Sequence, residues 1–275
     1  MLSTPKTRLN KELNMIKPSE NRTYSKILPG LVGFTLAQFN ASFRQFLWVW
    51  LTLILSLYVS WIVLANANFA YGVWHDYAGI SENIEEYAPQ NRFRHHFETT
   101  DNETRKTLFA GIVTGIHQHG VDLQALSYPH PTKPIQIPLL HRAEIVHLTD
   151  VANLIDFLKN LGWGLLLIWS VLTIYLLKTR QPFPSPKKTF INVGVGLFVF
   201  AVPVAIVGVK NVFYQLHIWI FPAEHQWFFY YQDSLMSTMM KAPDLFAYIG
   251  LSLSGLAFLL FSILLKLLNR KIAPN

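Results

Sequence analysis

Two segments that lie far apart in the sequence each place a histidine where it could exchange a proton with a bound molecule. Residues 141–151 (HRAEIVHLTDV) contain His147, and residues 214–236 contain His217. A histidine side chain titrates at about pH 6.5, so it can either accept or donate a proton near neutral pH. The sequence therefore indicates acid–base chemistry by His147 and His217, provided that the fold brings the two side chains together.

The first segment has the spacing of a helix with an acidic edge. On a period of 3.6 residues Glu144, His147 and Asp150 fall along one side, next to an apolar face. Such a helix is expected to lie at the membrane surface or to pack on a membrane span. The plainer alternative is a surface histidine that only pairs with a neighbouring acid.

The second segment surrounds His217 with large aromatic side chains. They are Trp219, Trp227, Phe228, Phe229, Tyr230 and Tyr231. Tryptophan and tyrosine are typical of a belt at the boundary between water and lipid. Membrane anchoring is therefore at least as good an account of these residues as ligand binding, and one residue can do both.

Other catalytic patterns fail on residue type or spacing. His141, Glu144 and His147 resemble a metalloprotease helix, but that zinc motif needs histidines about four residues apart, and these are six apart. His117 and His119 could contribute to a metal site, yet no further ligands can be identified. The chain has no cysteine, which excludes a disulfide framework, a cysteine–zinc site and a cysteine nucleophile. No metal or other cofactor is expected.

Four stretches of the chain are long enough and apolar enough to cross a membrane. Of the 275 residues 51% are hydrophobic, and charged residues are absent between Arg44 and His75 and within three later stretches, 160–177, 189–209 and 245–265. A helix of about 20 apolar residues spans the hydrocarbon core of a bilayer. We predict an all-α integral membrane protein with transmembrane helices at 46–66, 160–177, 190–209 and 246–265.

The basic residues predict on which side each connecting segment lies. The segments 1–45, 178–189 and 266–275 carry 14 lysines and arginines against two acidic residues, whereas 67–159 and 210–245 carry nine against 14. Because basic loops stay in the cytoplasm, both termini are predicted to be cytoplasmic and all ten histidines to lie outside. The isoelectric point of about 9.5 thus reflects segments that flank the membrane, which argues against nucleic-acid binding.

The segment 67–159 is too long for a plain connector and is predicted to form a largely helical extracytoplasmic domain. One helix is expected to begin at Ser81 and a second to run from Glu103 to about His117, with Gly120 ending it. The prolines of 128–134 exclude a regular helix there, and a short strand is expected at 135–137. Residues 1–45 form a basic leader, and the first span is expected to be retained rather than cleaved.

The two histidine segments resemble a known family. Residues 144–151 (EIVHLTDV) resemble the Glu-Ile-x-His-Met-x-Asp-Val signature of the bacterial lipoprotein intramolecular transacylase (Lit) family. Residues 214–246 resemble its second signature, a Phe-His followed by aromatics, a Trp and an Asp-x-Leu-x run, with Leu216 in place of the Phe. The resemblance covers roughly 47–265 and implies four transmembrane helices with an extracytoplasmic domain between the first two.

The resemblance also implies a reaction. In that family the sn-2 acyl chain of a diacylglyceryl-modified lipoprotein moves to the α-amino group of its N-terminal cysteine, which gives a lyso-form lipoprotein. His147 and His217 are implied to carry the chemistry, one as the base and the other as the acid or oxyanion donor. The residues expected to support them are Glu144, Asp150, Trp227 and Asp233, of which Glu144 or Asp150 would fix the tautomer of His147. The expected partners are diacylglyceryl-modified lipoproteins and membrane lipid, in the bacterial inner membrane.

Two other functional classes stay open from the sequence. A non-catalytic membrane protein whose outer loops bind a partner would keep its function when His147 or His217 is changed to alanine. A hydrolase or transporter with a histidine-liganded metal would contain metal and respond to chelators. Against a transporter, the predicted spans hold no ionisable side chain to mark an ion path.

Overall fold

The computed structural model describes residues 36–270, so most of the predicted basic leader and the last five residues lie outside the described part. Contacts between residues divide the chain into two units, 1–46 and 47–275. The long helices are α2 (Leu36–Asn66), α6 (Arg142–Lys178), α7 (Pro186–Val207) and α10 (Asp244–Arg270). The shorter elements are η2 (Asn68–Ala70), α3 (Tyr71–Tyr77), α4 (Ile80–Tyr87), η3 (Ala88–Gln90), η4 (Phe97–Thr99), α5 (Asn102–His117), η5 (Leu123–Ala125), β1 (Ser127–Pro129), β2 (Gln136–Pro138), α8 (Val209–Ile220) and α9 (Leu235–Met239).

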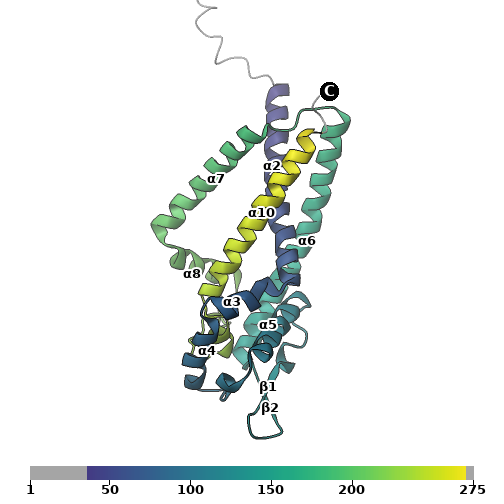
Figure 1. Cartoon of the computed structure of the whole chain (residues 1–275). Helices are drawn as coiled ribbons and strands as arrows, with labels where there is room; N and C mark the ends of the chain where they lie inside the picture. Colours follow the sequence, from purple (N-terminus) through teal and green to yellow (C-terminus); the bar gives the residue numbers. More distant parts are fainter. Residues whose placement is uncertain (1–35, 271–275) are drawn as a thin grey trace, which may run out of the picture. The chain divides into compact units, whose positions relative to one another are not determined.

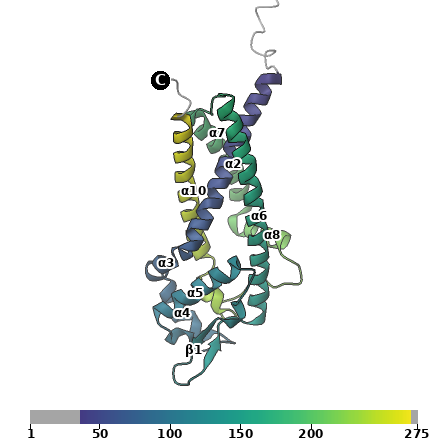
Figure 2. The same cartoon turned by 90° about the vertical axis from the view of Figure 1, so that its right-hand side faces the viewer.

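Four helices have the length and the apolar composition that a membrane span requires. They comprise Asn40–Asn66, Arg142–Lys178, Pro186–Val207 and Asp244–Asn269. Each of the four predicted spans overlaps one of these helices, although the third was predicted to end two residues beyond Val207, and this confirms an all-α membrane protein. Figures 1 and 2 show α3, α4, α5 and the β1–β2 hairpin gathered beside the first turns of α6, at one end of the long helices.

The helix that carries His147 and the second predicted span are one continuous helix, α6, of 37 residues. At about 1.5 Å per residue, such a helix is roughly 55 Å long, whereas the hydrocarbon core is about 30 Å thick. Its first turns must therefore project beyond the hydrocarbon. The expectation of a separate helix lying on the surface or packed on the second span is wrong, because no helix-breaking residue separates the polar turns from the apolar ones.

Polar contacts and a glycine join α2 to α6 along their length. The indole Nε1 of Trp48 donates a hydrogen bond to Thr173 Oγ1 at 2.8 Å, and that of Trp169 donates to Thr52 Oγ1 at 2.8 Å. A Cβ atom added at Gly162 would lie only 2.6 Å from the ring of Tyr58, so only glycine allows this close approach. Small residues and interhelical hydrogen bonds are the usual means of helix association within a membrane.

The extramembrane domain has its own apolar core, to which α9 contributes from the other end of the chain. The ring of Tyr71 stacks on Phe109 with centroids 3.9 Å apart, and its hydroxyl donates to the carbonyl of Met239 at 2.8 Å. Asn83 Nδ2 donates to the carbonyl of Thr238 at 2.8 Å. These bonds tie α3, α4 and α5 to α9, so the two segments predicted to lie outside the membrane form one body.

The sequence predicted some domain elements well and others poorly. Helix α5 runs from Asn102 to His117, close to the predicted 103–117, because the Asp101 side chain accepts the backbone N–H of Thr104 and caps it. Helix α4 begins at Ile80 after Gly79, one residue before the predicted start at Ser81. The predicted strand at 135–137 is β2, shifted by one residue and paired antiparallel with β1.

A sharp corner follows the third span. Helix α7 ends at Val207, and Gly208 adopts φ 89° and ψ 133°, a conformation open to glycine but strained for other residues. Helix α8 then starts at Val209 in a new direction, as Figure 1 shows. His217 is therefore carried by a separate short helix, and not by a continuation of the third span.

Candidate active site

The two predicted histidines meet, although 70 positions separate them in the sequence. His147 lies in the second turn of α6 and His217 near the end of α8, and their ring centroids are 6.4 Å apart at an interplanar angle of 33°. His147 is 9% exposed, and His217 is partly buried. The corner at Gly208 and the projection of α6 beyond the membrane bring them together.

The hydrogen bonds of His217 define its neutral tautomer. Its Nδ1 lies 2.8 Å from the carbonyl oxygen of Phe213, which can only accept, so Nδ1 carries the hydrogen. The lone pair of the neutral ring is then on Nε2, the nitrogen available to take a proton. Burial lowers the pKa of His217 below its usual value, and the bond to Phe213 opposes this shift.

His147 is enclosed and has an unused polar atom. Its Nδ1 is buried and makes no hydrogen bond to any described residue. A buried nitrogen without a partner is costly and uncommon, and such groups gather at sites that a ligand completes. The other ring nitrogen, Nε2, also makes no hydrogen bond to a described residue but is not buried, so Nε2 is the nitrogen available to a bound molecule.

Aromatic rings surround both histidines. The centroid of Phe213 is 4.0 Å from that of His217, and Trp227 lies against the same ring at 4.7 Å. Phe221 contacts both histidines, at 5.1 Å from His147 and 5.3 Å from His217. These rings exclude water and lower the local dielectric, which strengthens hydrogen bonds to a reacting group.

Glu144 does not orient His147, contrary to the expectation. The Glu144 carboxylate is 1% exposed and accepts three hydrogen bonds, from Ser234 Oγ at 2.5 Å and from the backbone N–H groups of His141 at 2.7 Å and Met236 at 3.3 Å. It thus joins the start of α6 to the start of α9. Glu144 was expected to pair with His147 because the two residues are close in the sequence. The carboxylate instead binds Ser234, His141 and Met236.

Asp150 binds a different histidine from the one expected. Its Oδ2 lies 2.6 Å from Nδ1 of His225, in the loop between α8 and α9. This contact ties the loop that carries Trp227 to α6, one turn beyond His147. Sequence reasoning had given His225 no role. The only signal for it was its position two residues before Trp227.

Asp233 also has a partner other than the two histidines. It pairs with Arg92 at 2.6 Å, and Arg92 is 65% exposed. Its expected support of the histidines is therefore not direct. The pair instead joins the end of the loop to the segment after α4, where the backbone N–H of Arg92 also donates to the carbonyl of Gln232 at 2.8 Å.

The remaining histidines of interest have structural partners. His117 Nδ1 donates to the carbonyl of Val113 at 2.7 Å, and its Nε2 accepts from Trp61 at 3.0 Å. His119 pairs with Asp156 at 2.5 Å. His141 caps α6 by accepting the backbone N–H of Ala143 at 3.2 Å. Within residues 36–270, no group of three or more histidine or acidic side chains is arranged to hold a metal ion.

Comparison with known proteins gives one informative likeness. No protein-family model matches the chain, and no curated protein matches it in sequence. A solved structure of the membrane integral lipoprotein intramolecular transacylase Lit from Bacillus cereus, with one histidine mutated to arginine, is similar with a TM-score of 0.60. The likeness covers 86% of this chain and 93% of that chain at 14% sequence identity. The two proteins share a fold.

Proposed function

We propose that this chain is a membrane acyltransferase that moves the sn-2 acyl chain of a diacylglyceryl-modified lipoprotein to the α-amino group of its N-terminal cysteine. The observation that carries the proposal is the meeting of His147 and His217, with centroids 6.4 Å apart, in a fold shared with a lipoprotein intramolecular transacylase. The two segments that carry these histidines are also those that resemble the signatures of that family.

The reaction is an aminolysis of an ester, in which one proton moves from nitrogen to oxygen. The neutral amine attacks the ester carbonyl, a bond from nitrogen to carbon forms, and the bond from that carbon to the glycerol oxygen breaks. His217 Nε2 accepts the proton from the amine and delivers it to the leaving glycerol oxygen, so the histidine is unchanged at the end. General acid–base catalysis of this kind contributes about 10²–10⁴-fold to the rate.

His147 has the complementary task. An N–H of its ring donates a hydrogen bond to the oxyanion that forms on the carbonyl oxygen. Nε2 is the candidate donor, because Nδ1 is buried and out of reach of a ligand. No covalent acyl-enzyme is needed, since amine and ester belong to one molecule and the tether gives a high effective concentration.

The placement of the site relative to the membrane is part of the proposal. The charge distribution supports cytoplasmic termini and a site on the outer face of the bacterial inner membrane. The α-amino group of a membrane-anchored lipoprotein would lie at that face. His147 is carried there because α6 extends beyond the hydrocarbon.

Mass spectrometry of a reporter lipoprotein tests the proposal. The reporter's N-terminal peptide is analysed from cells that leave the α-amino group free and that express this chain, its His147→Ala form or its His217→Ala form. We expect one acyl chain to move from glycerol to nitrogen only with the unchanged chain. His130→Ala serves as the control, since His130 lies in the loop of the β1–β2 hairpin, is partly exposed and packs on the ring of His96. An unmodified amine despite membrane expression of the unchanged chain would overturn the proposal.

A further inference from the structure

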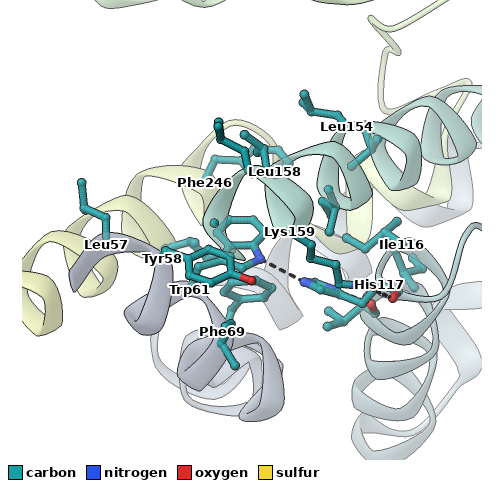
Figure 3. A pocket seen from close by; sticks show the side chains of 18 of the residues that line it. Leu57, Tyr58, Trp61, Phe69, Ile116, His117, Leu154, Leu158, Lys159 and Phe246 are labelled. Carbon is teal, nitrogen blue, oxygen red and sulfur yellow. Dashed lines mark hydrogen bonds between the residues drawn. The ribbon is translucent and has the colours of Figure 1, made fainter. Parts of the chain in front are cut away.

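A second feature of the molecule lies along the helix that carries His147 and has no part in the proton transfers. A cavity of about 470 Å³ lies between α2, α5, α6 and α10. Pockets of about 300–1,000 Å³ are the size that holds a small ligand. Figure 3 shows the side chains that line it, among them Trp61, Ile116, Leu154, Leu158 and Phe246.

The lining excludes water and polar ligands. Its side chains are almost all aliphatic or aromatic, and the polar groups of Trp61, His117 and Lys159 already have partners. Trp61 Nε1 donates to His117 Nε2 at 3.0 Å, and Lys159 Nζ donates to the carbonyl of His117 at 2.7 Å and to Asp156 at 3.2 Å. A water molecule needs two or more polar partners to be stable in a cavity. The matching occupant is hydrocarbon.

The cavity has exposed residues in its wall and shares a face of α6 with His147. Leu158 and Phe246 line the cavity and are 45% and 49% exposed, so hydrocarbon can enter from the side. Val151, Leu154 and Leu158 line it from α6, and His147 lies one turn before Val151. Because residues spaced by three or four share a helix face, His147 lies on the same face of α6 as Val151, Leu154 and Leu158.

We propose that this cavity holds one acyl chain of the diacylglyceryl substrate, with the ester end of the chain directed along α6 toward His147. The inference rests on the proposed function and adds to it a binding site for the lipid. Holding the chain would place its carbonyl at a set depth beside the histidines. It would also limit the length of the chain that fits.

Photo-crosslinking of the purified full-length protein in detergent tests the site without relying on catalysis. One probe is a diacylglyceryl-modified peptide with a diazirine in its acyl chain and an acetylated amine, which cannot react. A second is phosphatidylglycerol with the same labelled chain. We expect the lipopeptide to label peptides from 109–117 and 151–162, and unlabelled lipopeptide to compete. The proposal would be overturned if phosphatidylglycerol labelled the same peptides equally and unlabelled lipopeptide did not compete. It would also be overturned if the lipopeptide labelled only exposed residues of α7.

A pair of tryptophan substitutions on one helix provides the matched variants. Leu154→Trp fills the cavity, whereas Leu167→Trp makes the same change at a residue that is 66% exposed and does not line it. We expect Leu154→Trp to reduce lipopeptide labelling of the cavity by roughly tenfold and Leu167→Trp to leave it unchanged. Equal labelling in both variants would contradict the proposal. If Leu154→Trp does not fold, the proposal is tested by the labelling of the unchanged chain with the two probes, each with and without unlabelled lipopeptide.

The outcome separates this inference from the proposed function. Labelling of the cavity together with no acyl transfer to a free amine would keep the lipid site and reject the transacylase. Acyl transfer with no labelling of the cavity would reject the lipid site and keep the transacylase.

Discussion

His217 and His147 differ in what holds their nitrogens, and this difference divides their roles. The Phe213 carbonyl holds the hydrogen on Nδ1 of His217 and leaves Nε2 as the acceptor. His147 is more deeply buried, and because its Nδ1 is enclosed without a partner among the described residues, Nε2 is the nitrogen that can meet a ligand. One ring is therefore prepared to take a proton and the other to donate a hydrogen bond.

The pH dependence of the reaction should follow His217. Burial lowers the pKa of His217, so the neutral, basic form is present at pH values below those usual for histidine. Trp227→Ala removes a ring that buries His217, so we expect this pKa to rise and the acid limb of the rate profile to move to higher pH. Rates measured between pH 5 and 8 test this, with Tyr230→Ala as the control because Tyr230 is 63% exposed. An unmoved acid limb in Trp227→Ala would exclude His217 as the titrating base.

Glu144 should matter for stability more than for chemistry. Ser234→Ala removes a donor to a carboxylate that is 1% exposed, and it also removes the cap of α9. An unsatisfied buried acceptor costs about 1–3 kcal/mol, so the thermal unfolding temperature in detergent should fall. Ser262→Ala is the control, since its hydroxyl bonds only within α10. Equal unfolding temperatures for the two variants would show that the link between α6 and α9 contributes little.

At the scale of elements, the site depends on the loop between α8 and α9, which contacts α6. The contact between Asp150 and His225 joins that loop to the helix at 2.6 Å, and the two side chains are 14% and 35% exposed. A partly exposed pair of this kind contributes about 1 kcal/mol or less. Its effect is to hold Trp227 against His217.

A double-mutant cycle measures this contact. We expect Asp150→Asn and His225→Ala each to reduce the transfer rate by roughly two- to fivefold, which corresponds to about 0.5–1 kcal/mol. The double variant should be no slower than the worse single variant, because both remove the same contact. Fully additive losses would show that the two residues act separately.

The corner between α7 and α8 makes a second prediction at this scale. Gly208→Ala forces a side chain into a conformation with φ 89°, which costs about 1–3 kcal/mol and should displace His217. Gly194→Ala, in α7, is the control, since an added Cβ there has no neighbour within 4 Å. Transfer rate and thermal stability should fall only in the first variant. Equal behaviour of both would mean that α8 reaches its position without the glycine corner.

Local signals predicted the elements, and contacts across the sequence decided the site. The uncharged stretches located the four spans, and the cap at Asp101 is local enough to place the start of α5. The continuity of α6 was missed because its polar first turns and apolar later turns differ in composition. Ser234, which bonds to Glu144, and His225, which pairs with Asp150, are 90 and 75 residues away, so no periodicity could indicate them.

At the scale of the whole molecule, the proposal requires a definite orientation. The chain has no cysteine, so single cysteines introduced at exposed positions report their own accessibility. We expect Thr132→Cys in the hairpin loop to react with a membrane-impermeant maleimide in intact cells, and Ser185→Cys before α7 to react only after permeabilisation. The reverse pattern would place the histidines in the cytoplasm, away from exported lipoproteins.

The most direct test of the central claim is a crossover experiment with the purified chain. Two synthetic diacylglyceryl peptides are mixed, one with an isotope-labelled peptide and a labelled sn-2 chain, the other unlabelled in both. We expect mass spectrometry to find each chain on the nitrogen of its own peptide, and His217→Gln to reduce this transfer by about 10²-fold or more. Chains exchanged between peptides, or free fatty acid in place of the amide, would contradict the claim.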